Sequence, residues 1–478
     1  MDIIRSVVCP VCGCLCDDIE AKVENDRICG VINACALGAA KFENHLRNRN
    51  FVPLVRVGDQ LVKTSIDKAI KRSAEILASS SYPVLYGWSC TSCEAIQAGL
   101  ELAEEIGGLV DNTTSVCHGP SILAMQEVGL PSCTLGQIRH RADLIIYWAC
   151  NPWSSHPRHI ERYTAFSEGR FRRSVWRRFY LKLQSSSFKK KISRVSELFF
   201  KPRSELVSEK KVSNFPSPSA VERRVVVVDV RRTMSAEMAD YFLQVRPGGD
   251  YEVLQALRAL VRDEDLDVEE VSGIPLEVLE EVADMMISCN FGVIFFGLGL
   301  TMSRGRSMNV EAAIRLTREL NKRTKFVIMP MRGHFNVSGA NTVFTWQTGF
   351  PYAVDFSHGF PRYNPGETSV IDVLRRGDSD AALIVAADPV SSFPQEAVSH
   401  LLKTPLIVID PCFSPTAAMA DVVIPSAIAG IEAEGTAYRM DHVPLPLRRI
   451  VNPPPGCLPD EQIIRMILKE VRRLKGKR

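Results

Sequence analysis

The chain has 478 residues, of which 46% are hydrophobic and 24% charged, as in an ordinary globular protein with a large core. No apolar run approaches the roughly 18 residues of a membrane-spanning helix, and there is no signal peptide, so we expect a cytoplasmic protein without a membrane span. The 14 cysteines, clustered toward one end, favour metal chemistry in a reducing compartment over a disulfide framework.

Four cysteines near the start of the chain have the spacing of a metal-binding motif. Cys9, Cys12 and Cys16 are separated by two and three residues, and Cys35 follows at a distance. Three close thiols and a lone fourth are typical of a [4Fe–4S] cluster, which takes four thiolates. A structural zinc site is the competing interpretation, although zinc sites more often use two paired Cys-x2-Cys hooks.

From residue 65 onward, helical and strand patterns alternate. Thr91 and Glu94 have capping-box spacing and predict the start of a helix. Cys93 falls in the first turn of that helix, so we expect Cys90 and Cys93 to pack rather than bind a metal.

Cys117 and His118 then stand side by side at a predicted strand-to-helix turn. The next apolar strand, 142–148, leads into Asn151 and His156. In an open α/β sheet, residues just past the carboxyl ends of strands line the ligand crevice. Both features are therefore predicted to face one crevice.

Residues 170–220 form a strongly basic segment. It contains 14 Lys or Arg against 3 Asp or Glu, a net charge of +11, so the rest of a chain whose total is +3 carries −8. Phe171, Val175, Phe179 and Leu183 predict an amphipathic helix followed by a connector. A solvated insertion, a docking surface for an acidic subunit, and a membrane or nucleic-acid patch are the three interpretations, of which we expect docking.

Several further strands end in acidic, basic or glycine-rich turns, which together suit one large, phosphate-bearing ligand. The predicted binding residues after residues 225–229, 291–296, 325–329, 382–386, 406–409 and 422–424 are Asp229, Arg231, Thr233, Gly297, Gly299, Arg304, Gly333, His334, Asn336, Asp388, Asp410, Glu434, Gly435 and Thr436.

These motifs together resemble the B subunits of formylmethanofuran dehydrogenases, a family within the molybdopterin oxidoreductases. The resemblance rests on CPxCGxxCDD, VCHGPS, WACNPWSSHPRH, VVDVRRT, GLGLTMSRG, MPMRGHFNVSGAN and EAEGT, and it covers nearly the whole chain except about 174–220. It implies that Cys9, Cys12, Cys16 and Cys35 hold a [4Fe–4S] cluster. It also implies that Cys117 binds tungsten or molybdenum, which two molybdopterin guanine dinucleotides also hold, with His118 and Arg332 as active-site residues.

The resemblance further implies reversible reduction of CO2 to formate, which passes to a zinc-containing amidohydrolase-like subunit. Other expected partners are a subunit that completes the pterin site and ferredoxin-like electron carriers, but no nucleic acid. The rival functions are a redox-silent scaffold subunit of a formyltransferase/hydrolase complex, a conventional formate dehydrogenase, and a zinc-stabilised binding protein.

The predicted fold class is α/β, with a small iron–sulfur domain and two doubly wound domains around a bis-pterin crevice, without a C-terminal barrel domain. We expect four parts: a cluster domain at 1–60; an α/β domain at 61–155 and 335–445 that carries Cys117; a nucleotide-binding α/β domain at 156–334; and a C-terminal tail with a helix at 446–478.

Overall fold

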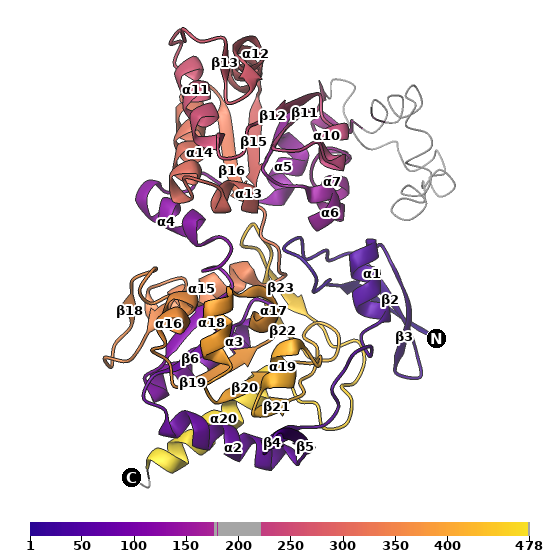
Figure 1. Ribbon diagram of the computed structural model, residues 1–478. Helices are drawn as coiled ribbons and strands as arrows, with labels where there is room; N and C mark the ends of the chain where they lie inside the picture. The colour runs from indigo at the N-terminus through magenta and orange to yellow at the C-terminus, as the bar shows by residue number, and fades with distance from the viewer. Residues whose placement is uncertain (176–178, 180–220, 477–478) are drawn as a thin grey trace. The chain divides into compact units, whose positions relative to one another are not determined.

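The structure is a computed structural model that describes residues 1–175, 179 and 221–476 (Figure 1). The chain forms two compact units: unit 1 contains Met1–Val116 and His334–Arg478, and unit 2 contains Cys117–Gly333. No helix among the described residues is long and apolar enough to cross a membrane.

Unit 1 is built on a nine-stranded sheet with the order β18-β17-β7-β6-β19-β20-β21-β4-β5. Its five central strands are parallel, and an antiparallel pair extends each edge. The strands are β4 (Leu54–Val57), β5 (Gln60–Lys63), β6 (Pro83–Gly87), β7 (Leu109–Asn112), β17 (Val354–Asp355), β18 (Arg362–Tyr363), β19 (Ala381–Val385), β20 (Leu406–Ile409) and β21 (Val422–Ile424).

Helices cover both faces of this sheet because its central strands are apolar on both sides. One face packs against α2 (Ile66–Ser79), α3 (Cys93–Ile106), α15 (Val337–Thr348) and α20 (Asp460–Lys475). The other packs against α16 (Val370–Arg376), α18 (Gln395–Leu401) and α19 (Pro415–Met419), near the short α17 (Pro389–Ser392). Cys93 is buried in the first of these cores, as predicted.

Two smaller sheets complete unit 1. The first is β1 (Asp2–Val7), β2 (Ile19–Glu24) and β3 (Arg27–Ile32), followed by α1 (Ala36–Glu43). The second is the hairpin of β22 (Gly435–Tyr438) and β23 (Pro444–Leu447).

Unit 2 contains a five-stranded, fully parallel sheet with the order β12-β11-β8-β15-β16. Its strands are β8 (Leu144–Trp148), β11 (Arg224–Asp229), β12 (Tyr241–Gln244), β15 (Phe291–Phe296) and β16 (Lys325–Pro330). In sequence order this is the 3-2-1-4-5 arrangement of a doubly wound nucleotide-binding fold.

Helices lie on both sides of this sheet as well (Figure 1). The core on one side includes α4 (Gly119–Val128), α11 (Asp250–Val261), α12 (Leu276–Ser288) and α14 (Ser307–Leu320). The remaining elements are α5 (Leu135–Arg141), α6 (Pro152–Ser155), α7 (Pro157–Arg162), α10 (Met234–Glu237), α13 (Leu298–Met302) and the strand pairs β9 (Arg172–Arg173) with β10 (Val221–Glu222) and β13 (Glu270–Val271) with β14 (Ile274–Pro275).

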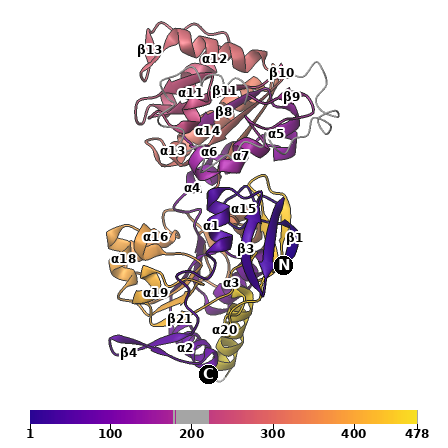
Figure 2. The same ribbon diagram turned by 90° about the vertical axis from the view of Figure 1, so that its right-hand side faces the viewer.

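Three predicted domain boundaries differ from the structure. Strand β8 pairs with β11 and β15, so Cys117 and residues up to 155 belong to unit 2 rather than to the first α/β domain. Strand β4, expected in the cluster domain, pairs with β21. The expected C-terminal tail supplies α20, which packs on α2 and α3 as part of the core (Figure 1 and Figure 2).

Two local predictions were also wrong. Ser92, not Thr91, caps α3 by accepting a hydrogen bond from the Ala95 amide. Arg172–Arg173, at the start of the predicted basic helix, form a strand. Most of that helix and its connector lie outside the described residues.

Candidate functional site

The carboxyl edge of the unit 2 sheet gathers most of the predicted site residues of this unit. Strand β8 comes first in the sequence and lies between β11 and β15, so the chain reverses its winding direction there, which is where doubly wound folds bind ligands. A Cβ on Gly297 would lie 2.5 Å from Cys150 Cβ, and one on Gly299 would lie 2.8 Å from Ala149 Cβ. Only glycine therefore fits where the segment after β15 crosses the end of β8.

Cys117 and His118 stand at the start of α4, where His118 is the N-cap residue. The buried Thr301 of α13 donates a hydrogen bond from Oγ1 to the Cys117 carbonyl at 3.0 Å. His118 is fully buried, and its Nδ1 lies 3.0 Å from Ser121 Oγ. Its Nε2 has no hydrogen-bond partner among the described residues. The Cys117 backbone and the His118 imidazole are thus each held by a hydroxyl.

Arg332 follows β16 and is only 2% exposed. His156, itself buried, donates from Nε2 to the Arg332 carbonyl at 2.8 Å, while its Nδ1 lies 2.8 Å from Ser155 Oγ. Both imidazole nitrogens are therefore used inside the unit. His156 thus holds the backbone that carries Arg332, and its contact with a cofactor stays a prediction.

Electrostatic interactions link Arg332 to both Cys117 and His118. Burial lowers the pKa of His118 to about 3; Arg332 lowers it further and the Met331 backbone opposes the shift. Burial lowers the pKa of Arg332 to about 10, and Cys117 opposes that shift. Burial raises the pKa of the Cys117 thiol to about 11, and Arg332 favours its thiolate. The three residues therefore form one site, with a thiol, a neutral imidazole and a guanidinium cation.

The predicted nucleotide-binding residues of unit 2 lie at the ends of its strands, in differing environments. Asn151, after β8, accepts a hydrogen bond from Ser235 Oγ at 2.7 Å. Asp229, at the end of β11, accepts one from the Arg231 amide at 3.3 Å. Thr233 Oγ1 is buried without a hydrogen-bond partner among the described residues. Three further predicted residues are exposed to solvent: Arg231, Arg304 and Gly333.

In unit 1, the Cys9 thiol lies near the thiols of the other three predicted cluster cysteines. Burial raises the pKa of Cys9 well above its usual value, and Cys16, Cys12 and Cys35 each raise it further. The Cys9 amide donates to the Cys16 carbonyl at 2.9 Å, which closes the loop that carries three of the thiols. Among the described residues, no three His, Cys, Asp or Glu side chains converge on a point that could hold a single metal ion.

A cavity of about 450 Å³ adjoins this cysteine loop. Pro10 and Val11 of the loop line it, together with Lys41, Cys90 and Asp410. Asp410 and Ala386 place it at the carboxyl ends of β20 and β19, the ligand-binding edge of the sheet. Burial raises the pKa of Asp410 to about 7 and that of Cys90 to about 11, and Lys41 opposes both shifts.

The other predicted residues of unit 1 are engaged mainly in its own structure. Asn336 is buried, donates to the Thr91 carbonyl at 2.8 Å and accepts from the Tyr438 amide at 2.9 Å. The Thr436 amide donates to Glu94 at 2.9 Å, and a Cβ on Gly435 would lie 2.5 Å from Ser92 Cβ.

Asp388 accepts a hydrogen bond from the Thr416 amide at 3.1 Å. His334 makes a backbone bridge to Cys12, and Glu434 is exposed.

Sequence reasoning missed Thr301 and Ser121, which hold Cys117 and His118. Both residues stand inside the quoted motifs GLGLTMSRG and VCHGPS. Spacing alone gives no indication of which hydroxyl reaches which partner, so only their presence in the motifs could have drawn attention to them.

Comparison with known proteins defines the class first. Residues 51–470 match the family described as Molybdopterin oxidoreductase. Among solved structures, the fold is similar to acetylene hydratase from Pelobacter acetylenicus, with a TM-score of 0.65 and 14% identity over 98% of this chain and 69% of that one.

Two curated relatives narrow the class. The chain is 44% identical to the B subunit of tungsten-containing formylmethanofuran dehydrogenase 2 of Methanocaldococcus jannaschii, over 99% of both chains. It is 42% identical to the protein of the same name from Methanococcus maripaludis, over 99% of this chain and 100% of that one. The chain therefore belongs to the family of formylmethanofuran dehydrogenase B subunits, which are oxidoreductases.

The fold is also similar to a chain in the structure of the formyltransferase/hydrolase complex FhcABCD from Methylorubrum extorquens with methylofuran. The TM-score is 0.66 and the identity 21%, over 89% of this chain and 100% of that one.

Proposed function

We propose that this chain reduces CO2 reversibly to formate at a tungsten or molybdenum centre carried by two molybdopterin guanine dinucleotides, within a formylmethanofuran dehydrogenase complex. The observation that carries the proposal is the convergence of Cys117, His118 and Arg332 at the carboxyl edge of one parallel sheet. The relatives named as tungsten-containing support the choice of metal chemistry.

The residues fit such a centre. A thiolate is the ligand that a soft, sulfur-rich metal site selects, and Arg332 favours the thiolate form of Cys117. When bound, the metal–pterin centre would supply the two-electron transfer. The strand-end residues of unit 2, including Asp229, Arg304 and the unpartnered hydroxyl of Thr233, would hold nucleotide and phosphate groups.

The protein's own groups would handle substrate and proton. Arg332 would orient CO2 and stabilise the carboxylate charge that develops as formate forms. Burial keeps His118 neutral, and its Nδ1 lies 3.0 Å from Ser121 Oγ. It would therefore pass on the one proton that formate requires, rather than donate from an imidazolium.

We further propose that Cys9, Cys12, Cys16 and Cys35 hold a [4Fe–4S] cluster, which binds one thiolate at each iron. The Cys9 thiol interacts with the other three thiols, and two- and three-residue spacings with a distant fourth cysteine fit a four-iron cluster better than a single zinc ion. Lys41 lines the cavity beside this loop, where it would stand between the cluster and a bound pterin.

The complex itself is part of the proposal. We expect a cytoplasmic assembly with a zinc-containing amidohydrolase-like subunit, a subunit that completes the pterin site, and ferredoxin-like electron carriers. The relatives are named as subunits, which supports an assembly.

The decisive experiment is metal and pterin analysis of the anaerobically purified complex, followed by Cys117→Ala. We expect about four irons in this subunit, one tungsten or molybdenum, and guanine-bearing pterin released on denaturation. Cys117→Ala should abolish CO2 reduction and keep the iron. The matched control is Cys29→Ser, which changes an exposed thiol outside the cluster motif. Zinc in place of iron, or no pterin, would favour a redox-silent scaffold, a role that the shared fold with the FhcABCD chain also suits.

A further inference from the structure

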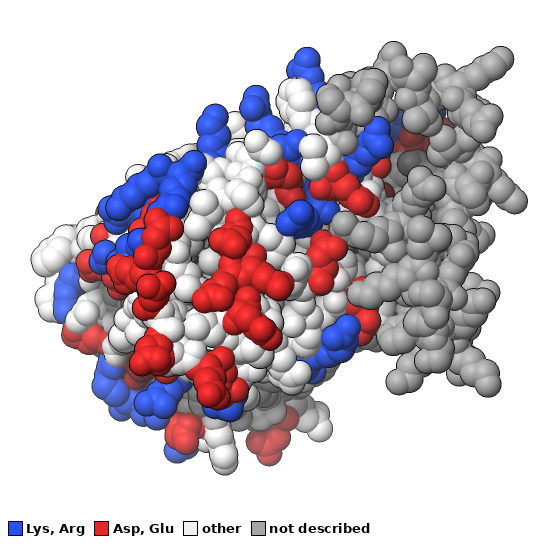
Figure 3. Space-filling model, turned by 90° about the horizontal axis from the view of Figure 1, so that it is seen from above, with Lys and Arg blue, Asp and Glu red and all other residues white. Residues whose placement is uncertain are grey.

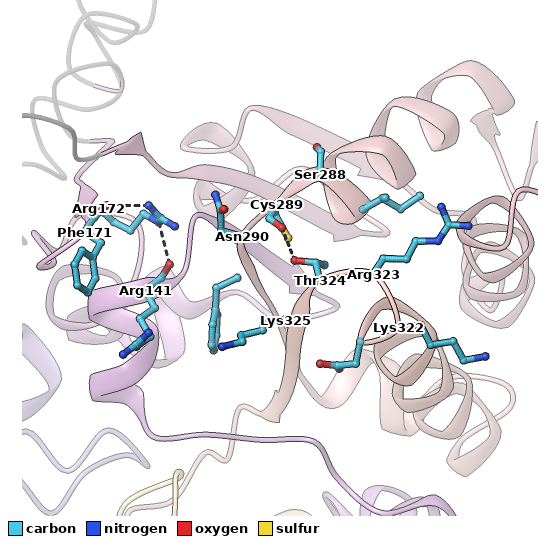
Figure 4. A pocket seen from close by; sticks show the side chains of 13 residues that line it. Arg141, Phe171, Arg172, Ser288, Cys289, Asn290, Lys322, Arg323, Thr324 and Lys325 are labelled. Atoms are coloured by element: carbon cyan, nitrogen blue, oxygen red, sulfur yellow. Dashed lines mark hydrogen bonds between the residues drawn. The ribbon is translucent and has the colours of Figure 1, made fainter.

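Unit 2 carries a hollow at the amino edge of its sheet, opposite the edge that carries the candidate active site. It measures about 900 Å³ and is lined where β15 and β16 begin, by residues such as Phe291 and Lys325 (Figure 4). Among the described residues, no acidic side chain lines it, and five cationic side chains do: Arg141, Arg172, Lys322, Arg323 and Lys325.

An adjoining hollow of about 570 Å³ shares Arg141 and Phe171 with the first and adds Arg170. Phe171 is 43% exposed, and the guanidinium groups of Arg141 and Arg170 lie 5.9 Å and 5.5 Å from its ring centre. We call the two hollows together the basic groove. It is an extended cationic surface with one exposed aromatic ring where its halves meet.

The described residues neutralise only part of this charge. Arg172 pairs with Asp143 at 3.3 Å, and Arg323 pairs with Asp263. Arg141, Lys322 and Lys325 form no ion pair with any described residue. Figure 3 views the molecule from above and shows several acidic side chains in the middle of this face, with many of the lysine and arginine side chains nearer its rim.

The position and chemistry of the basic groove argue against a small-molecule site. Doubly wound sheets bind their ligands at the carboxyl edge, and this groove lies at the amino edge. Small-ligand pockets are mostly apolar and enclosed, whereas this surface is cationic, with its aromatic ring exposed. Charged surfaces of this kind steer and align acidic protein partners.

We propose that the basic groove docks an acidic segment of a partner subunit, with an apolar side chain of that segment against Phe171. The inference rests on the assembly proposed above and not on the metal chemistry, so either can fail without the other. It agrees with the sequence, since Arg170 and Arg172 are the first cations of the basic segment 170–220.

The test uses the native complex, purified through a tag on this chain and treated with a zero-length carbodiimide, which joins lysine amines to carboxylates in direct contact. Mass spectrometry should find Lys322 or Lys325 joined to Asp or Glu residues of one short segment in another subunit. The double variant Arg141→Glu/Lys325→Glu should then weaken retention of that subunit at least tenfold at physiological salt. The control is Lys63→Glu/Lys68→Glu, which reverses two exposed charges in unit 1.

Three other outcomes would overturn the proposal. Cross-links from Lys322 and Lys325 only to this chain's own carboxylates would mean that the chain covers its own groove. No cross-links there, while other surface lysines react with partner subunits, would mean that the groove faces solvent. Salt-dependent binding of a single-stranded RNA probe that the double variant loses, with all subunits retained, would assign the surface to nucleic acid. A double variant that no longer unfolds cooperatively leaves the cross-links of the unaltered complex to decide.

Discussion

Two buried arginines, one in each unit, are held in different ways. In unit 1, Arg49 and Glu432 are both fully buried and form an ion pair at 2.9 Å, and Arg49 also donates to the Ser426 carbonyl at 3.0 Å. In unit 2, Arg332 faces the Cys117 thiol, and burial lowers its pKa to about 10. The first arginine is matched by a carboxylate within the fold. The second lies beside the candidate metal ligand Cys117, and we expect it to serve chemistry rather than stability.

Breaking the unit 1 pair should have the largest effect on stability. Arg49→Met leaves Glu432 as an uncompensated buried charge, which typically costs about 3–5 kcal/mol. Thermal unfolding should show a large fall in Tm. Arg49→Met/Glu432→Leu should recover much of it, because two apolar groups can replace a buried pair. An equal loss in Arg72→Met, which breaks an exposed pair with Glu75, would contradict this view.

Arg332→Met should have the opposite effect: a large fall in the rate of CO2 reduction and little change in Tm. Loss of a positioned charge that stabilises a developing carboxylate commonly lowers the rate by about 10²–10³. The Tm should stay level or rise, because the substitution removes the need to bury a cation. CO2 reduction and thermal unfolding measured on the same complex would check both parts. Arg318→Met, an exposed arginine of α14, is the control and should change neither.

Variants of His156 test whether the position of Arg332 matters for catalysis, because His156 contacts Arg332 through its backbone carbonyl. His156→Leu removes the hydrogen bond to the Arg332 carbonyl, and we expect about a tenfold fall in kcat, since small misplacements of a catalytic group are costly. His156→Gln should recover part of it, because its amide nitrogen can take the place of Nε2. A fall in metal content instead of kcat would return His156 to the cofactor site and contradict its role as a positioning residue.

The strands and their ends were predictable because their signals are local. Phe291–Phe296 and Leu406–Ile409 are apolar runs, and the structure gives both as strands with those bounds. The parallel-sheet rule predicted that the Cys117 turn and the end of strand 142–148 face one crevice. Arg332 was grouped with Cys117 and His118 only because the motifs VCHGPS and MPMRGHFNVSGAN resemble those of a known family.

What could not be predicted depends on partners far away in the sequence. Thr91 has the spacing of a cap, yet its hydroxyl donates to Asp460, 369 residues away, and Ser92 caps the helix instead. Asn336 fits a binding motif, but its side chain joins Thr91 to Tyr438. The unit boundary was misplaced for the same reason, because the partners of β8 come only with β11 and β15.

Thr301 offers the smallest and most specific test of the unit 2 site. Thr301→Val removes the donor to the Cys117 carbonyl and should lower the free energy of unfolding by about 0.5–1.5 kcal/mol. Thr317→Val removes a similar buried hydrogen bond, to Ala313 in α14 at 2.9 Å, and should cost about as much. The two variants should differ in tungsten or molybdenum content, which should fall only in Thr301→Val. Groups that orient a metal ligand tune the affinity of the site for the metal. Equal metal content in both would mean that the Cys117 backbone holds its position without Thr301, and that the hydroxyl serves stability alone.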